Sequence, residues 1–320
     1  MSTTTTPKTI LILGGTGNQG GALIRALLTT SNTNTPIQIL AVTRDPTTPH
    51  AQSLLSSLPK HPSTTIQLIQ GDLSDVPALF TTALEASPSN SIWGVYSVQA
   101  KPANDAGIPL EEVQGKAVID ASISQNVSFF VYSSVDRGGV EMSSDNPTTV
   151  PHWATKHRVE KHLEEKTQNG EKMRYCVLRP TAFMENLSND FAGKAMAASW
   201  SAVLKHRKLQ LVAIRDIGWF GAEAFLHPEE FAGTYLSLAG AELSFEEANQ
   251  IFKEKVGSDM PATYGCVAKA LLHVVKSLGA MFEWLKKNQG GADVEALRRM
   301  KPDLMDFGTW LEKDSQFRKK

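Results

Sequence analysis

Cysteine is scarce in this chain, which has only Cys176 and Cys266 among its 320 residues. The two lie far apart, and neither sits in a cluster of cysteine and histidine, which argues against a disulfide framework and against a zinc site. An excess of one charge is also missing, because 32 basic residues balance 33 acidic ones. The sequence therefore shows no overall basic footprint for direct binding of nucleic acid or a membrane.

Long apolar runs are absent as well. The longest apolar segment, residues 266–285, is interrupted by Lys269, His273 and Lys276, so it does not predict a membrane span. Residues 2–7 are rich in threonine and lack the charged and apolar parts of a signal peptide. We therefore expect an intracellular, cytoplasmic protein. Nuclear entry stays open, because the basic run at 318–320 is too short to decide it.

Glycine is concentrated in residues 10–21, which read ILILGGTGNQGG. An apolar run enters this turn and an amphipathic run leaves it, which predicts a buried parallel strand followed by a helix. The start of such a helix binds phosphate through its unpaired N–H groups. Both Gly14/Gly17/Gly20 and Gly15/Gly17/Gly20 fit a dinucleotide fingerprint, and we favour the first because Gly14 directly follows the strand. The predicted cofactor-binding residues of the turn are Gly14, Thr16, Gly17, Asn18, Gln19 and Gly20.

A second strand is predicted at residues 37–42, and it ends just before Arg44. In dinucleotide folds this strand end meets the adenosine ribose, where an acidic residue suits NAD and an arginine suits the 2′-phosphate of NADP. Arg44 comes first after the strand, and Pro46 then turns the chain away, which leaves Asp45 as a turn residue. The order favours NADP(H) as the cofactor. The alternative is that Arg44 is only a solvated loop charge.

The third predicted strand, residues 65–70, leads into Gly-Asp-Leu-Ser-Asp at 71–75. Here Asp72 could accept a hydrogen bond from the adenine amino group while the backbone N–H of Leu73 meets the ring. Alternatively, Asp72 caps the helix that follows, or Ser74 supplies that cap. The sequence leaves these roles open.

Strands and helices alternate as far as residue 180. This order predicts an α/β fold with a doubly wound parallel sheet of the Rossmann type. The carboxyl ends of the first, fourth and fifth strands meet at one edge. Gln99 to Lys101 should therefore approach the pyrophosphate and the nicotinamide ribose, and Ser133 should approach the reactive end of the cofactor. The remaining predicted strands are residues 91–98, 127–132 and 174–178, and the helices between them are residues 110–126 and 151–166.

We expect residues 1–180 to form the NADP(H)-binding Rossmann domain. Residues 181–320 should form a smaller, mostly helical lobe for substrate or partner, from which some strands could return to the sheet. Phe183, Met184 and Asn186 are candidate pocket residues, although core packing is the simpler role for Phe183. The pattern further predicts a pocket-side loop at 216–224, a helix at 228–238, a helix at 245–255 opened by a Ser244/Glu247 capping box, and one long amphipathic helix at 263–287.

Several segments together resemble the NmrA-like branch of the short-chain dehydrogenase/reductase superfamily. That branch includes fungal nitrogen-metabolite regulators, an animal NADPH sensor, and quinone and phenylcoumaran-type reductases. The resemblance covers most of the first 190 residues and, more loosely, residues 306–312, and it implies a Rossmann fold that binds NADP(H). The matching segments are GGTGNQGG at 14–21, VTRDP at 42–46, GDLSD at 71–75, VYSSV at 131–135, HWATKHRVE at 152–160 and LRPTAFMENL at 178–187.

One departure from the superfamily is informative. Active short-chain dehydrogenases use a tyrosine and a lysine four residues apart, the lysine holding the nicotinamide ribose and the tyrosine acting as general acid. This chain keeps Lys156 but has His152 one turn earlier, and no tyrosine lies between residues 132 and 175. His152 could donate a proton at neutral pH or could simply pack at the start of the helix. Ser133 could orient a substrate.

Two functions are compatible with these residues. The missing tyrosine favours a redox-responsive sensor or regulator that binds NADP(H) and acts through a protein partner such as a transcription factor. The alternative is an NADPH-dependent reductase of a quinone, enone or small carbonyl, in which Lys156 acts without the usual tyrosine. For the second reading, the catalytic residues would be Lys156, His152 and Ser133. No metal site is expected.

Overall fold

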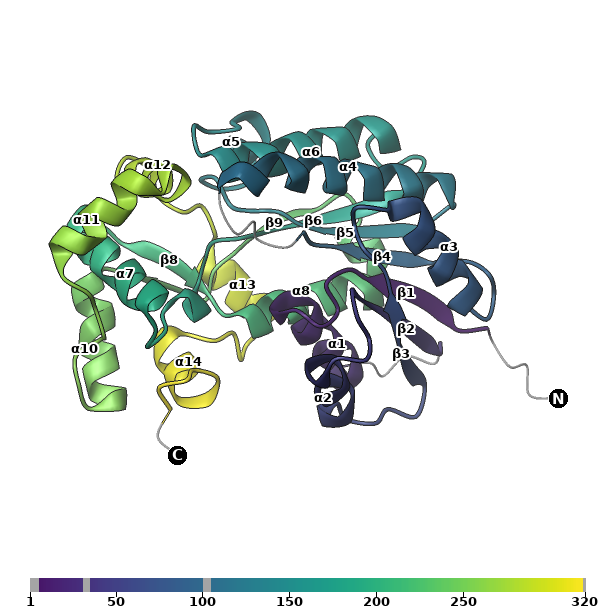
Figure 1. The fold of residues 1–320 in the computed structure, drawn as a ribbon, viewed down its shortest axis with the longest axis horizontal. Helices are drawn as coiled ribbons and strands as arrows, with labels where there is room; N and C mark the ends of the chain where they lie inside the picture. The colour runs from purple at the N-terminus through teal and green to yellow at the C-terminus, as the bar shows by residue number, and fades with distance from the viewer. Residues whose placement is uncertain (1–5, 31–34, 100–104, 319–320) are drawn as a thin grey trace.

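A seven-stranded sheet forms the centre of the computed structural model, which describes residues 6–30, 35–99 and 105–318 (Figure 1). The strand order is β3–β2–β1–β4–β5–β6–β9, and every neighbouring pair is parallel. The predicted doubly wound Rossmann sheet is therefore confirmed. Its strands are β1 (Lys8–Ile12), β2 (Ile37–Thr43), β3 (Thr64–Gln70), β4 (Gly94–Ser97), β5 (Phe129–Ser133), β6 (Arg174–Pro180) and β9 (Tyr235–Leu238).

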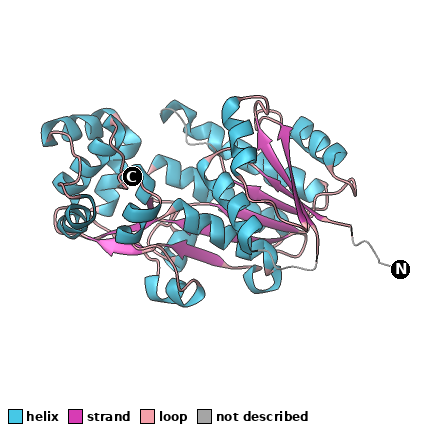
Figure 2. Cartoon of the chain, turned by 90° about the horizontal axis from the view of Figure 1, so that it is seen from below, coloured by secondary structure: helices cyan, strands magenta, loops and turns pink. Residues whose placement is uncertain are grey.

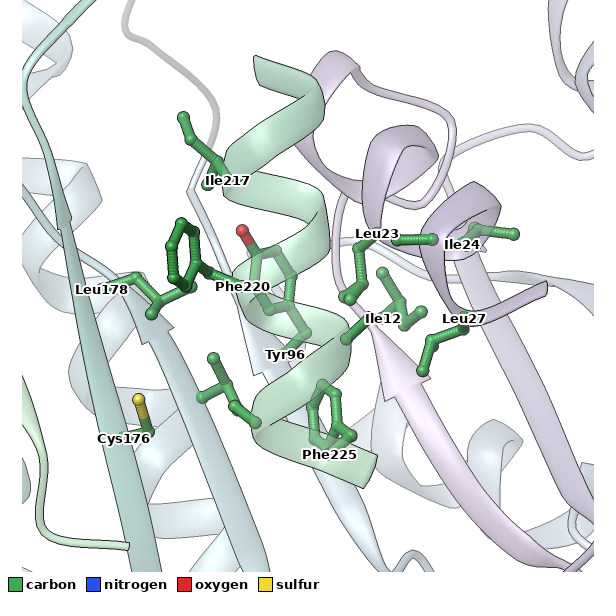
Figure 3. Packing of buried hydrophobic residues seen from close by; sticks show 14 of the residues in the cluster. Ile12, Leu23, Ile24, Leu27, Tyr96, Cys176, Leu178, Ile217, Phe220 and Phe225 are labelled. Carbon is green, nitrogen blue, oxygen red and sulfur yellow. The ribbon is translucent and has the colours of Figure 1, made fainter. Parts of the chain in front are cut away.

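Helices cover both faces of this sheet (Figure 1). On one face, α1 (Asn18–Thr30) and α8 (Ile214–Leu226) bury leucine, isoleucine and phenylalanine side chains against β1 and β4, as Figure 3 shows. On the other face, α3 (Val76–Ala86), α4 (Ile108–Ser124) and α6 (Pro151–Thr167) build a second cluster. Strands buried on both faces need the near-continuous apolar runs that the sequence has.

The chain reverses its direction of growth between β1 and β4. From β1 it builds β2 and β3 on one side, and β4 then starts on the other side of β1. In open parallel sheets the carboxyl ends on either side of such a switch point form the ligand site. Three further short elements belong to this part, namely α2 (Pro49–Ser57), the 3-10 turn η1 (Asp105–Gly107) and α5 (Val140–Asp145).

The second lobe is mostly helical and stands beside the sheet (Figure 2). A small sheet in the order β10–β8–β7 lies within it, and Trp200, Phe252 and Trp310 fill its core. Its elements are β7 (Ala182–Phe183), η2 (Met184–Asn186), α7 (Phe191–Ser199), η3 (Trp200–Leu204), β8 (Leu209–Val212), β10 (Ala241–Leu243), α10 (Phe245–Val256), α11 (Gly265–Val274), α12 (Lys276–Leu285), α13 (Val294–Met300) and α14 (Phe307–Lys313). The predicted capping box of Ser244 and Glu247 is confirmed at the start of α10.

The expected pocket-side loop at 216–224 is wrong, because these residues form α8. The glycines that suggested a loop serve close packing instead. A Cβ added to Gly218 would come within 2.7 Å of the Cβ of Ala22 on α1. Trp219 is partly buried and packs against the core between the sheet and the helices α1 and α8.

The expected helix at 228–238 is also wrong. Only α9 (Pro228–Phe231) is helical, and Gly233 then takes a φ of +74°, which ends the helix and starts β9. The N–H of Gly233 donates to the carbonyl of Tyr175, and β9 pairs with β6. Both α8 and β9 follow residue 180, so the chain returns to the Rossmann sheet after entering the second lobe.

The long helix expected at 263–287 is two helices. It bends by 112° between α11 and α12 at Val275, whose backbone is not helical (φ −91°, ψ 90°). After the bend the two helices approach closely, since a Cβ added to Gly279 would come within 2.3 Å of the carbonyl oxygen of Leu272. In the part of the chain that the structure describes, no single helix is long and apolar enough to span a membrane, and only this bent pair meets that criterion jointly.

Glu185 of η2 connects α8, which packs on the sheet, with α14 of the second lobe. Its Oε1 accepts hydrogen bonds from the N–H of Ile214 (3.0 Å) and from Nε1 of Trp310 (3.2 Å). Its other oxygen is buried without a hydrogen-bond partner in the described structure. Burial raises the pKa of Glu185 above its ordinary value. The folded protein therefore holds this proton more tightly than the unfolded chain does, so the contribution of Glu185 to stability is greatest at low pH and falls as the pH rises.

We accordingly expect Glu185→Gln to be at least as stable as the wild type at pH 8, with a melting temperature equal or higher by about 2 °C. The amide keeps the accepting oxygen and removes the charge. At pH 4 the difference should vanish, because the wild-type carboxyl is then protonated. Thermal melts at both pH values check this, and a large loss of stability at pH 8 would contradict it.

Candidate functional site

The glycine turn between β1 and α1 has the geometry of a tight phosphate-type loop. Gly14 takes a φ of +61°, and the N–H of Gly17 donates to its carbonyl at 2.8 Å. A Cβ added to Gly20 would come within 2.2 Å of that same carbonyl oxygen. Gly15 instead packs on β2, where its Cβ would come within 2.7 Å of the Cβ of Ala41. The turn itself is thus built by Gly14, Gly17 and Gly20.

The outer surface of this turn is open. Gly14, Gly17 and Asn18 are exposed, and the first turn of α1 contains no acidic residue. Thr16 is half-buried and donates from Oγ1 to Oγ1 of Thr43 at the end of β2 (3.4 Å). The N-terminus of α1 therefore presents a partial positive charge at an exposed surface, which suits an anionic group.

Arg44 and Asp45 differ in how the structure uses them. Arg44 is exposed and makes no ion pair within the described residues. Asp45 turns back to accept hydrogen bonds from Oγ1 (2.6 Å) and N–H (2.8 Å) of Thr47, and these bonds hold the pKa of its carboxyl below its ordinary value. Asp45 is therefore occupied as a turn residue, while the guanidinium of Arg44 is available.

Both helix-cap roles considered for the next loop are wrong. Asp75 caps α3 by accepting from the N–H of Ala78 (3.1 Å). Asp72 instead accepts from the N–H of Ser74 at 2.8 Å. That hydrogen bond lowers the pKa of the Asp72 carboxyl, and the charge of Arg44 adds to the effect. The carboxyl therefore lies within electrostatic reach of Arg44, while the roles of Asp72 and Leu73 toward an adenine remain predictions.

The amide of Gln19 connects the turn with the ends of β4 and β5. Its Oε1 accepts hydrogen bonds from the Ser133 hydroxyl (2.7 Å) and from the Tyr96 hydroxyl (3.1 Å). Burial raises the pKa of Tyr96 well above its ordinary value, so this phenol stays a donor. Tyr96 was not predicted from the sequence, where it is one apolar position in a buried strand.

Lys156 points from α6 toward the end of β5. Its Nζ donates to the carbonyl oxygen of Ser133 (3.2 Å) and forms an ion pair with Oε1 of Glu111 on α4 (2.8 Å). The ammonium also lies 5.6 Å from the ring centroid of Tyr132. Sequence reasoning missed Glu111, because it comes from the start of a separate helix and belongs to no motif.

His152 lies in the first turn of α6 and is half-buried. Its ring packs edge-on against Trp153, with 6.0 Å between centroids, and Trp153 in turn packs edge-on against Trp284 of α12 at 4.9 Å. The structure thus brings Ser133, Lys156 and Gln19 together, with His152 packed toward the aromatic contact with the second lobe. Lys101 lies outside the described residues.

Beside this group lies a fully buried ionic cluster. Glu160 of α6 forms ion pairs at 2.7 Å with both Arg137 and Arg179, and it accepts a hydrogen bond from the hydroxyl of Ser134. Burial alone would raise the pKa of Glu160, but the two guanidinium groups outweigh it and hold that pKa below its ordinary value. The cluster carries one net positive charge and fixes the loop that follows β5.

The three pocket residues expected early in the second lobe differ in burial. Met184 is fully buried in the core of that lobe, so a pocket role for it is wrong. Phe183 is partly buried and packs against the core on the face of the sheet covered by α1 and α8, and Asn186 is exposed.

The parallel sheet, its switch point and the glycine turn define a Rossmann-type α/β protein. The model of the NmrA-like family matches residues 6–311, and the chain belongs to this family. The NmrA-like family domain-containing oxidoreductase hkm9 of Aspergillus hancockii is 30% identical over 132 residues, which make up 40% of this chain and 34% of hkm9. The chain therefore matches about a third of the length of that curated relative.

Solved structures agree on the fold. Triphenylmethane reductase from Citrobacter sp., complexed with NADP(H), has a TM-score of 0.70 at 14% identity, over 96% of this chain and 100% of that chain. NmrA, a negative transcriptional regulator solved in complex with NADP, has a TM-score of 0.64 at 16% identity, over 97% and 95%. At such identities the similarity concerns the fold.

Proposed function

We propose that this protein binds NADP(H) along the carboxyl edge of the sheet and acts as a redox-responsive regulator through a protein partner. The observation that supports a regulatory role is how Lys156 is held and which residue precedes it on α6. Its ammonium is held by Glu111 and by the carbonyl of Ser133, and the residue one turn earlier is His152, so α6 offers no phenol as a general acid. The solved complex of NmrA with NADP gives a precedent for a regulator on this fold.

The residues present fit a dinucleotide. The pyrophosphate would meet the N-terminus of α1 at Asn18, and the exposed Gly17 before it has no side chain to prevent close approach. The 2′-phosphate would pair with Arg44, which is exposed and free of ion pairs among the described residues. At the other end, Lys156 would hold the nicotinamide ribose. In the same arrangement, Asp72 and the N–H of Leu73 would contact the adenine.

Arg44→Ala should weaken NADPH binding by about tenfold or more and change NADH binding little. The reason is that NADH lacks the 2′-phosphate, so only NADPH loses a charge-assisted contact, which is worth about 1.5–3 kcal/mol. Titrations of both nucleotides into the wild type and the variant measure the difference. Equal losses for the two nucleotides would contradict the role of Arg44.

The regulatory function requires the two redox forms to bind differently, since a ligand that binds two states equally shifts nothing. We expect the dissociation constants of NADPH and NADP⁺ for the wild-type protein to differ by about fivefold or more. Calorimetric titration with each form provides the test. Equal constants would remove the basis for a redox sensor while leaving cofactor binding intact.

A reductase is the second candidate, and a specific contact favours it. Lys156 reaches the end of β5, where a hydride from bound NADPH and a proton from the ammonium would together reduce a quinone, enone or small carbonyl. The Ser133 hydroxyl could then orient the substrate. The fold shared with triphenylmethane reductase and the description of hkm9 as an oxidoreductase agree with this alternative.

A further inference from the structure

Glu111 is a buried carboxylate whose ion-pair partner is Lys156. Its side chain is 5% exposed and that of Lys156 is 16% exposed, and 2.8 Å separates Glu111 Oε1 from Lys156 Nζ. Removing two charges from water is costly, so a buried ion pair is weak evidence for a purely stabilising role. The position of this pair therefore calls for a functional explanation.

The position follows from the sheet. Lys156 Nζ lies 3.2 Å from the carbonyl oxygen of Ser133, the last residue of β5. Arg44 stands after β2, on the opposite side of the switch point, and marks the adenosine end of a bound dinucleotide. The nicotinamide end therefore belongs beside β4 and β5, where the ion pair is. This step rests on the proposed binding of NADP(H).

The two redox forms differ there by one charge, because the nicotinamide ring is positive in NADP⁺ and neutral in NADPH. A cation beside the ring disfavours the oxidised form, and an anion favours it. Contacts to the phosphates and riboses are common to both forms and cancel in the ratio of the two dissociation constants. That ratio therefore reports on charge near the ring.

Two neighbouring sets of charged groups have ion-pair partners of their own. Glu112, next to Glu111, is held between Lys116 (2.7 Å) and Arg158 (2.6 Å). The cluster around Glu160 has one net positive charge and is locked by its own hydrogen bonds. Glu111 and Lys156 instead form an ion pair with no net charge directly at the end of β5.

We propose that the Glu111–Lys156 ion pair sets the preference of this protein between the oxidised and reduced forms of its cofactor. Lys156 favours the neutral reduced ring. Glu111 offsets that bias and also holds Lys156 at the carbonyl of Ser133. The pair thereby determines how strongly the fraction of protein that carries each form depends on the ratio of NADPH to NADP⁺ in solution.

The test is a cycle of variants titrated with NADPH and with NADP⁺ at pH 8. Glu111→Gln should raise the ratio of the NADP⁺ to the NADPH dissociation constant by about threefold or more, because the lysine charge becomes uncompensated. Lys156→Met should lower the ratio by a similar factor, and the double variant should return close to the wild type. Glu112→Gln, on the same helix, is the matched control and should leave the ratio unchanged.

Equal ratios in all variants, or shifts of the same sign in both single variants, would overturn the proposal. If Glu111→Gln does not fold, as judged by circular dichroism, Lys156→Met against Glu112→Gln decides the question, since only the former should lower the ratio. Failure of the wild type to bind either nucleotide would instead refute the proposed function. The two failures are thus distinguishable within one set of titrations.

Discussion

Gly17→Val should raise the dissociation constant for NADPH by about a hundredfold or more, equivalent to roughly 2.7 kcal/mol, and shift the melting temperature little. Gly17 is exposed and has no positive φ, so a valine can adopt its backbone conformation. A Cβ there meets only the carbonyl oxygen of Gly14, at 3.1 Å. The branched side chain would instead cover the N-terminus of α1, where we place the pyrophosphate. Titration with NADPH, together with a thermal melt, measures both effects.

Gly20 provides the contrast for this prediction. A Cβ at Gly20 would come within 2.2 Å of the Gly14 carbonyl oxygen, so Gly20→Ala should destabilise the fold itself. Loss of binding in a folded Gly17→Val variant would show that Gly17 serves ligand binding, whereas Gly20 serves the packing of the turn. Wild-type affinity in that variant would show that the cofactor does not approach the turn closely.

Glu160→Ala should destabilise the protein by about 3–5 kcal/mol, since it leaves two buried arginines without their shared carboxylate. Arg137 and Arg179 are fully buried, and both depend on Glu160 for charge compensation. Chemical denaturation monitored by tryptophan fluorescence measures the loss. Glu165→Ala is the matched control on the same helix, because Glu165 is 75% exposed and its loss should cost less than about 0.5 kcal/mol.

The same cluster predicts a pH dependence. Because the pKa of Glu160 is lower in the folded protein than in the unfolded chain, its contribution is complete above the ordinary glutamate pKa of about 4.3 and is lost as the pH falls further. Stability of the wild type should therefore decline in acid more steeply than that of Glu160→Ala. A loss of less than about 1 kcal/mol in Glu160→Ala at pH 7 would contradict the account of the cluster.

The first six strands could be predicted because the buried ones have near-continuous apolar runs, and the edge strand β3 has an alternating pattern with β-branched residues. The C-terminal errors have a common cause, which is that tertiary contacts overrode local signals. Gly218 reads as a loop residue, yet it permits α8 to pack on α1. The apolar stripe of residues 263–287 continues through Val275, where the backbone leaves the helix.

The candidate site was predictable where motifs mark it and not elsewhere. Gly14, Arg44 and Lys156 belong to local patterns whose chemistry is known. Glu111 and Tyr96 gain their importance from segments far away in the chain, since Glu111 meets Lys156 and Tyr96 meets Gln19. No local spacing encodes such meetings. They follow from the order of the strands and from how α4 and α6 lie beside each other.

The central claim is that this site binds NADP(H) without the general acid of a typical reductase. The most direct test is NADPH oxidation by the purified protein against quinones, enones, aldehydes and a triphenylmethane dye, with Lys156→Ala measured alongside. The account predicts tight NADPH binding by titration and no turnover above the rate of that variant. Turnover that requires Lys156 would contradict the regulatory function and make the protein a reductase.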